Sequence, residues 1–302
     1  MKVLLLGSTG QVGKELLPRL KEANYEVIAP TRAELDLYEL SAVKNFLGDC
    51  SPNLIINAAA YTAVDKAETE VENAFKLNAH LPETLAAFCQ ARGIRLIHYS
   101  TDYVYNGSGE KPWIETDPVN PLSVYGKSKL AGDNAIINSK CNALIFRTSW
   151  VVSVHGHNFI KTMLKLGQEK EALSIVADQV GAPASAEFIA ATTMEAIESL
   201  QKNEIERGVY HLAPRGYTSW YELAKFVFEE AKNNGLELRI KHESISPVTT
   251  EEYPTPAKRP NNSRLNYEKL EKALNTEFKN WQFDIKHIVK QLVVESKEGI
   301  AI

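Results

Sequence analysis

The chain has 302 residues, enough for a large core and for roughly two domains at about 150 residues each. Its composition, 44% hydrophobic and 24% charged, is typical of a soluble globular protein. With 34 Lys and Arg against 38 Asp and Glu, the net charge of -4 provides no basic surface for nucleic acid or an anionic membrane. These values favour a soluble enzyme or a binder of small ligands.

The cysteines and the N-terminal stretch point to a reducing compartment. Cys50, Cys89 and Cys141 lie far apart with no Cys-x-x-Cys spacing, which indicates neither a disulfide framework nor a zinc site. The apolar stretch that begins at Lys2 reaches Gly7 after five residues, too few for a secretory signal. No window approaches the ~20 apolar residues of a membrane span. We therefore expect a cytoplasmic protein.

The first half of the chain alternates short apolar runs with amphipathic segments. The runs have the length of strands buried on both faces, and the segments between them are long enough for crossover helices. We predict strands at Lys2 to Leu6, Glu26 to Ala29, Leu54 to Asn57, Arg95 to Ser100 and Ala143 to Thr148. We predict helices at Val12 to Ala23, Ser41 to Leu47, Val71 to Arg92 and Pro121 to Asn138. This pattern predicts an α/β fold with a Rossmann-like, doubly wound parallel sheet.

Beyond Trp150 the pattern is mixed, and the segment from Pro247 to Arg264, rich in Pro, Thr and Asn, should be an irregular loop. We predict further helices at Asn158 to Leu166, Glu187 to Gln201 and Trp220 to Asn233, and strands at Ser174 to Val176 and Tyr210 to Leu212. Residues 151–302 should mainly form a smaller C-terminal α/β substrate-binding domain, with some segments returning to the Rossmann-like domain of residues 1–150.

A glycine-rich turn directly follows the first strand and opens the first helix. Its glycines, Gly7, Gly10 and Gly13, permit a tight turn and a close approach of the backbone to a ligand. The helix N-terminus then offers unpaired amides and a partial positive charge to a pyrophosphate. We expect residues 1–150 to bind a dinucleotide. The spacing i, i+3, i+6 resembles that of short-chain dehydrogenases of the extended type.

The end of the second strand reads Ala29-Pro30-Thr31-Arg32 and lacks the acidic residue that holds a ribose 2'-hydroxyl in many dinucleotide sites. Arg32 could instead meet a 2'-phosphate. The sequence therefore favours NADPH, with NADH as the alternative and a solvated Arg32 as the competing interpretation.

Tyr125 and Lys129 lie four residues apart in a predicted helix and so share one face. A free tyrosine, with a pKa of about 10, is a poor acid or base near neutrality, but a nearby cation favours the phenolate and lowers the pKa. The pair suits proton transfer to a carbonyl. Many surface helices carry such a pair, so the spacing alone is weak evidence.

Several motifs in shared order resemble the dTDP-4-dehydrorhamnose reductase family over nearly the whole chain. Besides the glycine turn, the motifs are Asn57 to Glu68, His98 to Tyr105, Tyr125 to Gly132, Phe146 to Trp150, Asp178 to Pro183 and Tyr253 to Leu265. The resemblance implies NAD(P)H-dependent reduction of dTDP-4-dehydrorhamnose to dTDP-L-rhamnose. It implies a catalytic triad of Thr101, Tyr125 and Lys129, with Tyr125 protonating the sugar oxygen.

The resemblance also implies the binding residues, each of which has a competing interpretation as a core or solvated side chain. The cofactor residues carried over from the family would be Gly10, Gln11, Val12, Asp36, Leu37, Ala60, Tyr61, Thr62, Tyr99, Tyr125 and Lys129. Gly7, Gly13 and Arg32 join them from the reasoning above, and Arg32 departs from the family, many members of which have an acid there. The dTDP-sugar would contact Thr101, Asp102, Trp150, Asn158, Arg259 and Asn262.

Some members of this family form a homodimer bridged by a divalent metal through three glutamates. Glu15 and Glu187 match two of them, but the third position, near Gln291, lacks a carboxylate, which weakens a site for Mg²⁺ considerably. His155 and His157 have no carboxylate or cysteine partner at ligand spacing. The sequence therefore disfavours Mg²⁺, with Glu15 and Glu187 as its only candidate ligands, and leaves a homodimer open.

Two other functions are the alternatives. A nucleotide-sugar dehydratase or epimerase resembles this fold, but dehydratases carry an Asp-Glu pair after the threonine, where this chain has Asp102 and Tyr103. A non-catalytic NADP-binding regulatory subunit could lose the catalytic groups, yet Thr101, Tyr125 and Lys129 are all present.

Overall fold

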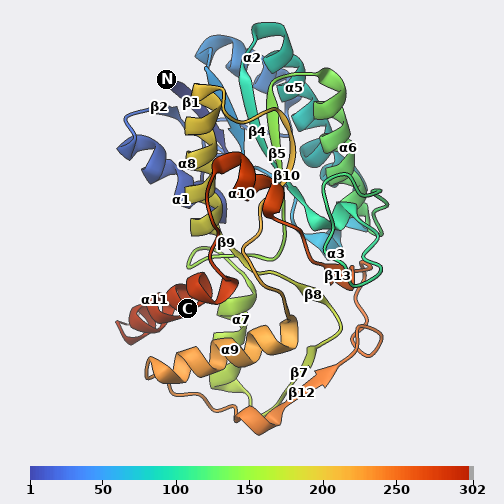
Figure 1. Ribbon diagram of the computed structural model, residues 1–302, viewed down its shortest axis with the longest axis vertical. Helices are drawn as coiled ribbons and strands as arrows, with labels where there is room; N and C mark the ends of the chain where they lie inside the picture. Colours follow the sequence, from blue (N-terminus) through green and yellow to red (C-terminus); the bar gives the residue numbers. More distant parts are fainter. Residues whose placement is uncertain (299–302) are drawn as a thin grey trace.

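The computed structural model describes residues 1–298, and its largest element is a six-stranded sheet in which all strands are parallel. The strand order is β10-β5-β4-β3-β1-β2 (Figure 1). The strands are β1 (Lys2–Leu6), β2 (Glu26–Ile28), β3 (Leu54–Asn57), β4 (Arg95–Thr101), β5 (Ala143–Thr148) and β10 (Gly208–His211). The order runs outward from β1 in both directions, as a doubly wound sheet requires.

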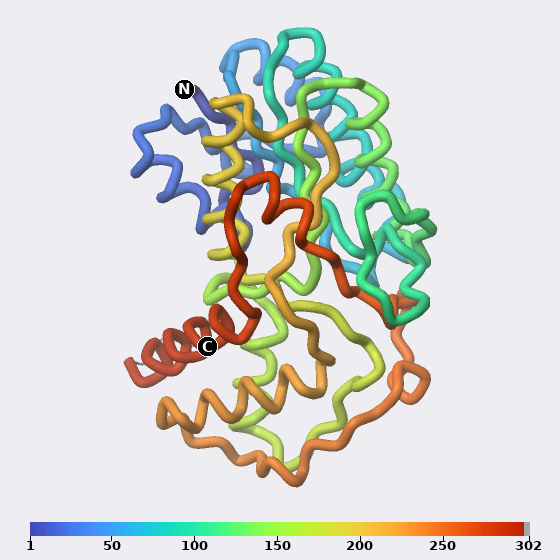
Figure 2. Tube along the Cα trace, viewed as in Figure 1, coloured from blue at the N-terminus to red at the C-terminus, as the bar shows by residue number. Residues whose placement is uncertain are grey.

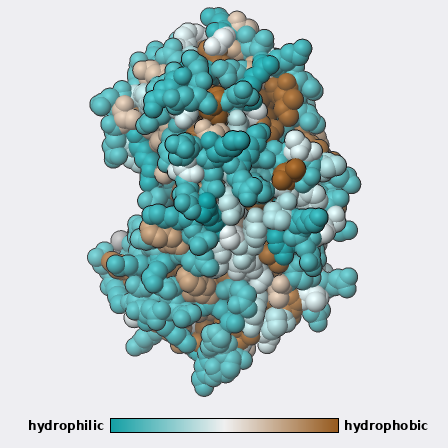
Figure 3. Space-filling model, viewed as in Figure 1, coloured by the Kyte–Doolittle hydropathy of each residue, from teal (hydrophilic) through white to brown (hydrophobic). Residues whose placement is uncertain are grey.

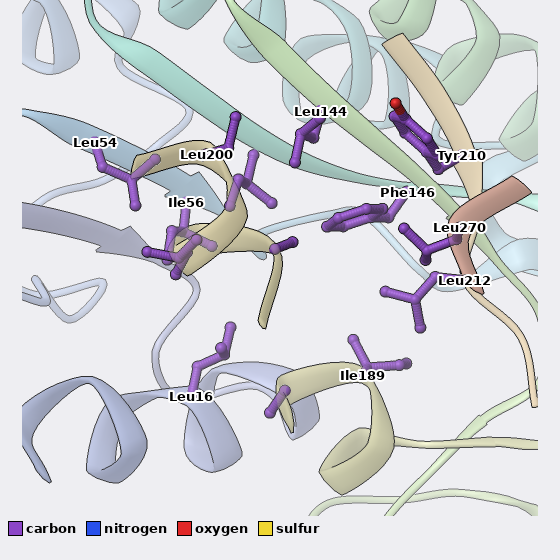
Figure 4. Packing of buried hydrophobic residues seen from close by; sticks show 14 of the residues in the cluster. Leu16, Leu54, Ile56, Leu144, Phe146, Ile189, Leu200, Tyr210, Leu212 and Leu270 are labelled. Carbon is purple, nitrogen blue, oxygen red and sulfur yellow. The ribbon is translucent and has the colours of Figure 1, made fainter. Parts of the chain in front are cut away.

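Helices cover both faces of this sheet. Because side chains alternate along a strand, Val3 and Leu5 face one layer while Leu4 and Leu6 face the other. The first layer contains α1 (Gln11–Glu22) and α8 (Ala186–Lys202), whose Leu16 and Ile189 reach the same core (Figure 4). The second contains α2 (Leu40–Cys50), α5 (Leu81–Arg92) and α6 (Val124–Ser139). The predicted α/β fold is confirmed.

The segment predicted as one helix from Val71 to Arg92 is broken into three. It consists of α4 (Val71–Phe75), a π-helical turn (Lys76–His80) and α5. Pro82 has no N–H to donate to the carbonyl of Asn78, so a regular α-helical bond is missing at this point. The buried Asn78 side chain accepts a hydrogen bond from the Tyr61 N–H at 2.8 Å and donates to the Ser128 hydroxyl at 3.0 Å.

A smaller part of the molecule lies beyond the carboxyl ends of the large sheet (Figure 1). Its helices α7 (Phe159–Glu169), α9 (Trp220–Asn233) and α11 (Trp281–Lys297) share a second core. Its strands form the pairs β7 (Leu173–Val176) with β12 (Ile245–Val248) and β6 (Val151–Val152) with β9 (Ala184–Ser185). A third group joins β11 (Thr218–Ser219), β8 (Val180–Gly181) and β13 (Asn262–Ser263).

The prediction of an irregular loop from Pro247 to Arg264 was wrong at its two ends, where β12 and β13 pair with other strands. Four short elements complete the fold: α3 (Val64–Ala67), α10 (Glu268–Leu274) and the 3-10 turns Asp102–Val104 and His242–Ser244.

The chain passes between the two parts several times, as the colour changes in Figure 2 show. After β6 and α7 it returns to the large sheet as α8 and β10, and it returns again as α10 before ending with α11. The face seen in Figure 3 is mainly hydrophilic, with small scattered hydrophobic areas. Within residues 1–298, no helix is both long and apolar enough to cross a bilayer.

Candidate active site

The glycine turn between β1 and α1 is closed so tightly that two of its glycines have no room for a side chain. Gly7 has φ +79°, and a Cβ there would lie 2.6 Å from the backbone of Ala58 and Ala59. A Cβ on Gly13 would lie 2.1 Å from the carbonyl oxygen of Gly7. Gly10 is the N-cap of α1, so the free amides of the first helical turn border this turn.

A cavity of about 760 Å³ opens over this turn at the carboxyl ends of the strands. It lies where ligands bind in open α/β sheets, and the lack of side chains at Gly7 and Gly13 suits the close approach of a pyrophosphate. Eight of the predicted cofactor residues line it: Gly7, Gly10, Arg32, Asp36, Leu37, Ala60, Tyr61 and Thr62. The exposed Arg32 lies over the ring of Tyr38 at 5.8 Å.

The other predicted cofactor residues do not line this cavity. Val12 packs against the first core and Gly13 supports the turn, while the Gln11 amide oxygen accepts a hydrogen bond from Asn158 at 3.1 Å. The Tyr99 side chain packs in the same core, where its hydroxyl is 2.7 Å from that of Thr193. Only the Tyr99 main chain faces the Tyr125 helix, through its carbonyl oxygen.

Helix α6 presents Tyr125 and Lys129 from its first two turns. Ser123 ends the preceding loop and caps the helix, since its hydroxyl accepts a hydrogen bond from the Gly126 N–H at 3.2 Å. Gly126 allows α6 to pack closely, because a Cβ there would lie 2.3 Å from the Tyr103 carbonyl oxygen. The predicted helix is therefore present, although it begins at Val124 rather than Pro121.

Lys129 is buried and points to β4 rather than to Tyr125. Its Nζ donates to the Tyr99 carbonyl at 2.6 Å and lies 3.4 Å from His98 Nε2. Burial lowers the pKa of Lys129 to about 8, against the opposing effect of Asp133. The expectation that Lys129 lowers the pKa of Tyr125 is wrong for this structure, because burial raises that pKa to about 12.

The hydroxyl of Thr101, at the end of β4, interacts with the phenol of Tyr125 and favours its ionised form, opposing the effect of burial. The same hydroxyl donates to Asp102 Oδ1 at 3.1 Å, while Asp102 Oδ2 is buried without a partner in the structure. Burial raises the pKa of Asp102 to about 6. The buried Thr101 and Asp102 and the half-buried Tyr125 thus form one group of proton donors and acceptors.

A second cavity, of about 650 Å³, lies in the smaller part of the molecule. Tyr103, which contacts the ring of Tyr125 edge-on with centroids 5.5 Å apart, forms part of its wall. Trp220 also lines this cavity. Its ring stacks on that of Trp150 with centroids 3.6 Å apart, and its indole N–H donates to Gln179 Oε1 at 3.2 Å. Trp150 itself lies behind Trp220, at φ +49°. Sequence reasoning missed Trp220, because nothing in the sequence indicates this stacking.

Arg259 lines the second cavity and pairs with a carboxylate from the other part of the molecule. Its guanidinium donates to both oxygens of Asp65, at 3.1 Å and 2.8 Å, and Asp65 also accepts from the Ala257 N–H at 3.1 Å. This bidentate pair fixes the Pro-rich segment against α3. Sequence reasoning missed Asp65 as the partner.

Two predicted substrate residues have their amides engaged within the protein. Asn158 caps α7 and donates to the Ser153 carbonyl at 2.6 Å. Asn262, 1% exposed, donates to the Lys111 carbonyl at 2.8 Å and accepts from Arg264 at 3.0 Å. Neither lines the two large cavities, and their contacts with substrate stay predictions.

The two glutamates considered as metal ligands, Glu15 and Glu187, border one small hollow together with His287 and Gln291. Arg19 pairs with both glutamates, at 2.7 Å and 3.4 Å, and so already supplies a positive charge. Among residues 1–298, no three His, Cys, Asp or Glu side chains are arranged to hold a metal ion. The residues present therefore do not fit a Mg²⁺ site.

Similarity to known proteins extends over almost the whole chain. The model of the RmlD substrate binding domain family matches residues 1–294. The dTDP-4-dehydrorhamnose reductase of Escherichia coli (strain K12) is 44% identical over 296 residues, covering 97% of this chain and 98% of that protein. The chain belongs to the dTDP-4-dehydrorhamnose reductase family.

Solved structures of this family share the fold described above. A reductase from Clostridium acetobutylicum is 37% identical with a TM-score of 0.88, covering 97% of this chain and 99% of its own. A reductase from Bacillus anthracis, solved in complex with NADP, is 32% identical with a TM-score of 0.85 and the same coverage. The family predicted from the sequence is confirmed.

Proposed function

We propose that this member of the dTDP-4-dehydrorhamnose reductase family reduces the 4-keto group of dTDP-4-dehydrorhamnose to give dTDP-L-rhamnose. The observation that carries the proposal is the grouping of Thr101, Asp102 and Tyr125 beyond the carboxyl ends of the strands, with the glycine-lined cavity at the same edge of the sheet. A dinucleotide site with an adjacent proton donor suits carbonyl reduction.

A reduced nicotinamide dinucleotide supplies the hydride when it is bound. In the proposal, the amides at the start of α1 and the bare backbone at Gly7 hold its pyrophosphate. Tyr125 donates its proton to the sugar oxygen, and the Thr101 hydroxyl turns from Asp102 to donate a hydrogen bond that fixes this oxygen. The raised pKa of Tyr125 keeps the phenol protonated at neutral pH, the state that a proton donor needs.

We propose NADPH as the preferred cofactor. The supporting observation is Arg32, which is exposed and lines the cavity close to the end of β2, where a 2'-phosphate would be placed. The relative solved with NADP agrees with this proposal.

We propose that the second cavity receives the dTDP moiety. Trp220 provides an aromatic wall, and Arg259 provides two parallel N–H donors of the kind that bind phosphate oxygens. In this proposal the diphosphate competes with Asp65 for Arg259, and the sugar reaches Asp102 and Tyr125 past Tyr103.

The test is to incubate the protein with dTDP-4-keto-6-deoxy-L-lyxo-hexose and NADPH and to identify the product by NMR. We expect dTDP-L-rhamnose. The Tyr125→Phe variant should bind NADPH but reduce the sugar about 10²- to 10⁴-fold more slowly. Tyr25→Phe, which removes a phenol distant from the site, serves as the control. A wild-type protein that binds NADPH and turns over no keto sugar would indicate the regulatory-subunit alternative.

The homodimer stays a prediction. With Arg19 between Glu15 and Glu187, any dimer should form without a bridging metal. Sedimentation with and without a chelator tests this expectation.

A further inference from the structure

Two buried polar side chains connect the cofactor cavity to Lys129. Asn57, at the end of β3, and His98, in β4, are paired residues of neighbouring strands, so their side chains emerge on the same face. Each is 1% exposed, and Asn57 Nδ2 is 3.1 Å from His98 Nδ1. His98 Nε2 lies 3.4 Å from the ammonium nitrogen of Lys129.

The partners of Asn57 determine which nitrogen of His98 carries the proton. The Ala59 main-chain N–H donates to Asn57 Oδ1 at 3.3 Å, which fixes the orientation of the amide. Asn57 Nδ2 can only donate, so His98 Nδ1 must accept. Burial and the charge of Lys129 hold the pKa of His98 well below its usual value, so the ring is neutral. The single ring proton is therefore on Nε2.

This tautomer directs an N–H group at Lys129. An ammonium has three donors and no acceptor, so it gains no hydrogen bond from His98 Nε2–H, whereas a neutral amine could accept one. The other contact of Lys129 Nζ is the Tyr99 carbonyl at 2.6 Å. The charge of Asp133, one turn along α6, opposes the deprotonation of Lys129. The Asp133 carboxylate is itself paired with Arg147 at 3.1 Å.

We propose that Asn57 and His98 are positioning residues that lower the proton affinity of Lys129, because Asn57 fixes the His98 tautomer that presents an N–H group to the lysine. The inference rests on the proposed reductase function, in which a reduced nicotinamide supplies the hydride and Tyr125 gives one proton to the sugar oxygen. The phenolate so formed regains its proton from solvent, since Tyr125 is only half-buried. A Lys129 that readily becomes neutral leaves less positive charge near the phenolate, which favours this reprotonation.

The Ala59 amide extends this chain of hydrogen bonds to the cofactor cavity, since Ala59 lines that cavity. A ligand that shifts the Ala58–Ala60 segment would alter the Asn57 amide and, through His98, the proton affinity of Lys129.

The first experiment measures the tautomer directly, by ¹⁵N NMR of the imidazole of His98 in the full-length wild-type protein. We expect a protonated Nε2 and an unprotonated Nδ1 between pH 6 and 8. A proton on Nδ1, or on both nitrogens, would overturn the proposal. This measurement does not depend on turnover, so its outcome is independent of whether the proposed function holds.

The second experiment uses Asn57→Leu, which keeps the approximate size but removes the donor. His98 can then carry its proton on Nδ1 and offer Nε2 as an acceptor to the ammonium. Because one hydrogen bond to a charged group is gained, the titration of Lys129, followed by ¹³C NMR of its Cε, should move upward by about one pH unit. The basic limb of the kcat profile should move with it.

Thr193→Val is the matched control, because it removes a part-buried hydrogen bond to the Tyr99 hydroxyl and none of the hydrogen bonds that join Asn57, His98 and Lys129. Its Lys129 titration should match that of the wild type. An Asn57→Leu variant with a wild-type Lys129 titration would contradict the proposal. If Lys129 shifts as expected and no keto sugar is reduced by the wild type, the proposed function fails while the effect of Asn57 on Lys129 stands.

Discussion

Among the glycines of residues 1–298, Gly13 leaves the least room for a Cβ, and Gly13→Ala tests whether the glycine turn is a phosphate site. The new Cβ would lie 2.1 Å from the Gly7 carbonyl oxygen and 2.6 Å from the Ser8 Cα, both of which are backbone atoms. Such overpacking costs about 1–3 kcal/mol, and the better helix propensity of alanine offsets at most ~1 kcal/mol of it. We expect the free energy of unfolding to fall by roughly 1–2 kcal/mol.

The same change should weaken NADPH binding, because an opened turn moves the amides at the start of α1. Losing one hydrogen bond to a charged group costs about 1.5–3 kcal/mol, which raises Kd by roughly 10- to 100-fold. Urea unfolding measures the stability, and fluorescence titration with NADPH measures the affinity.

Gly48→Ala is the control for the Gly13 variant. Gly48 also lies in a helix, α2, but apart from its chain neighbours and the backbone of its own helix no atom lies within 4 Å of the position of its Cβ. This variant should gain up to ~1 kcal/mol in stability and bind NADPH like the wild type. If Gly13→Ala kept wild-type stability and affinity, the reasoning about the turn would be refuted.

Three further predictions concern single side chains. Arg259→Ala should raise the KM for the sugar nucleotide about tenfold or more and lower kcat less, since it removes hydrogen bonds to a charged group; the reverse pattern argues against binding. Arg32→Ala should reduce the preference for NADPH over NADH in kcat/KM, and an unchanged ratio would contradict the assignment. Asp102→Asn should gain stability relative to the wild type as pH rises from about 4 to about 6. Burial raises the pKa of Asp102 from 3.8 to about 6, so in this window the folded state keeps a proton that the unfolded state has lost, and wild-type stability falls by roughly 3 kcal/mol. The check is the free energy of unfolding of both proteins, measured with urea at each pH. If the two curves of this free energy against pH are parallel, the carboxyl group of Asp102 has no such raised pKa.

Local patterns predicted the large sheet and the approximate positions of its helices well. The strands predicted from the apolar runs were correct, because strands buried on both faces are recognisable from composition alone. The same holds for the glycine turn, where spacing and the preceding strand identify the conformation. The helix of Tyr125 and Lys129 was also correct, because it depends on residues close together in the sequence.

What could not be predicted depends on contacts between distant segments. Asp65 and Arg259 are 194 residues apart, and nothing near either one indicates the other. The orientation of Lys129 toward β4 depends on the carbonyl of Tyr99 and on His98, whereas helical spacing suggested only Tyr125. Burial then dominates the pKa of Tyr125, and the depth of a side chain is a tertiary property.

The repeated passage of the chain between its two parts limits how this fold can be divided or recombined. A fragment ending at Trp150 would lack the edge strand β10 and would leave α1 without its neighbour α8. The two parts should therefore unfold together, in one cooperative transition. The smaller part therefore cannot be exchanged as a block between relatives. A new sugar specificity has to be introduced by substitutions in the segments that line the second cavity.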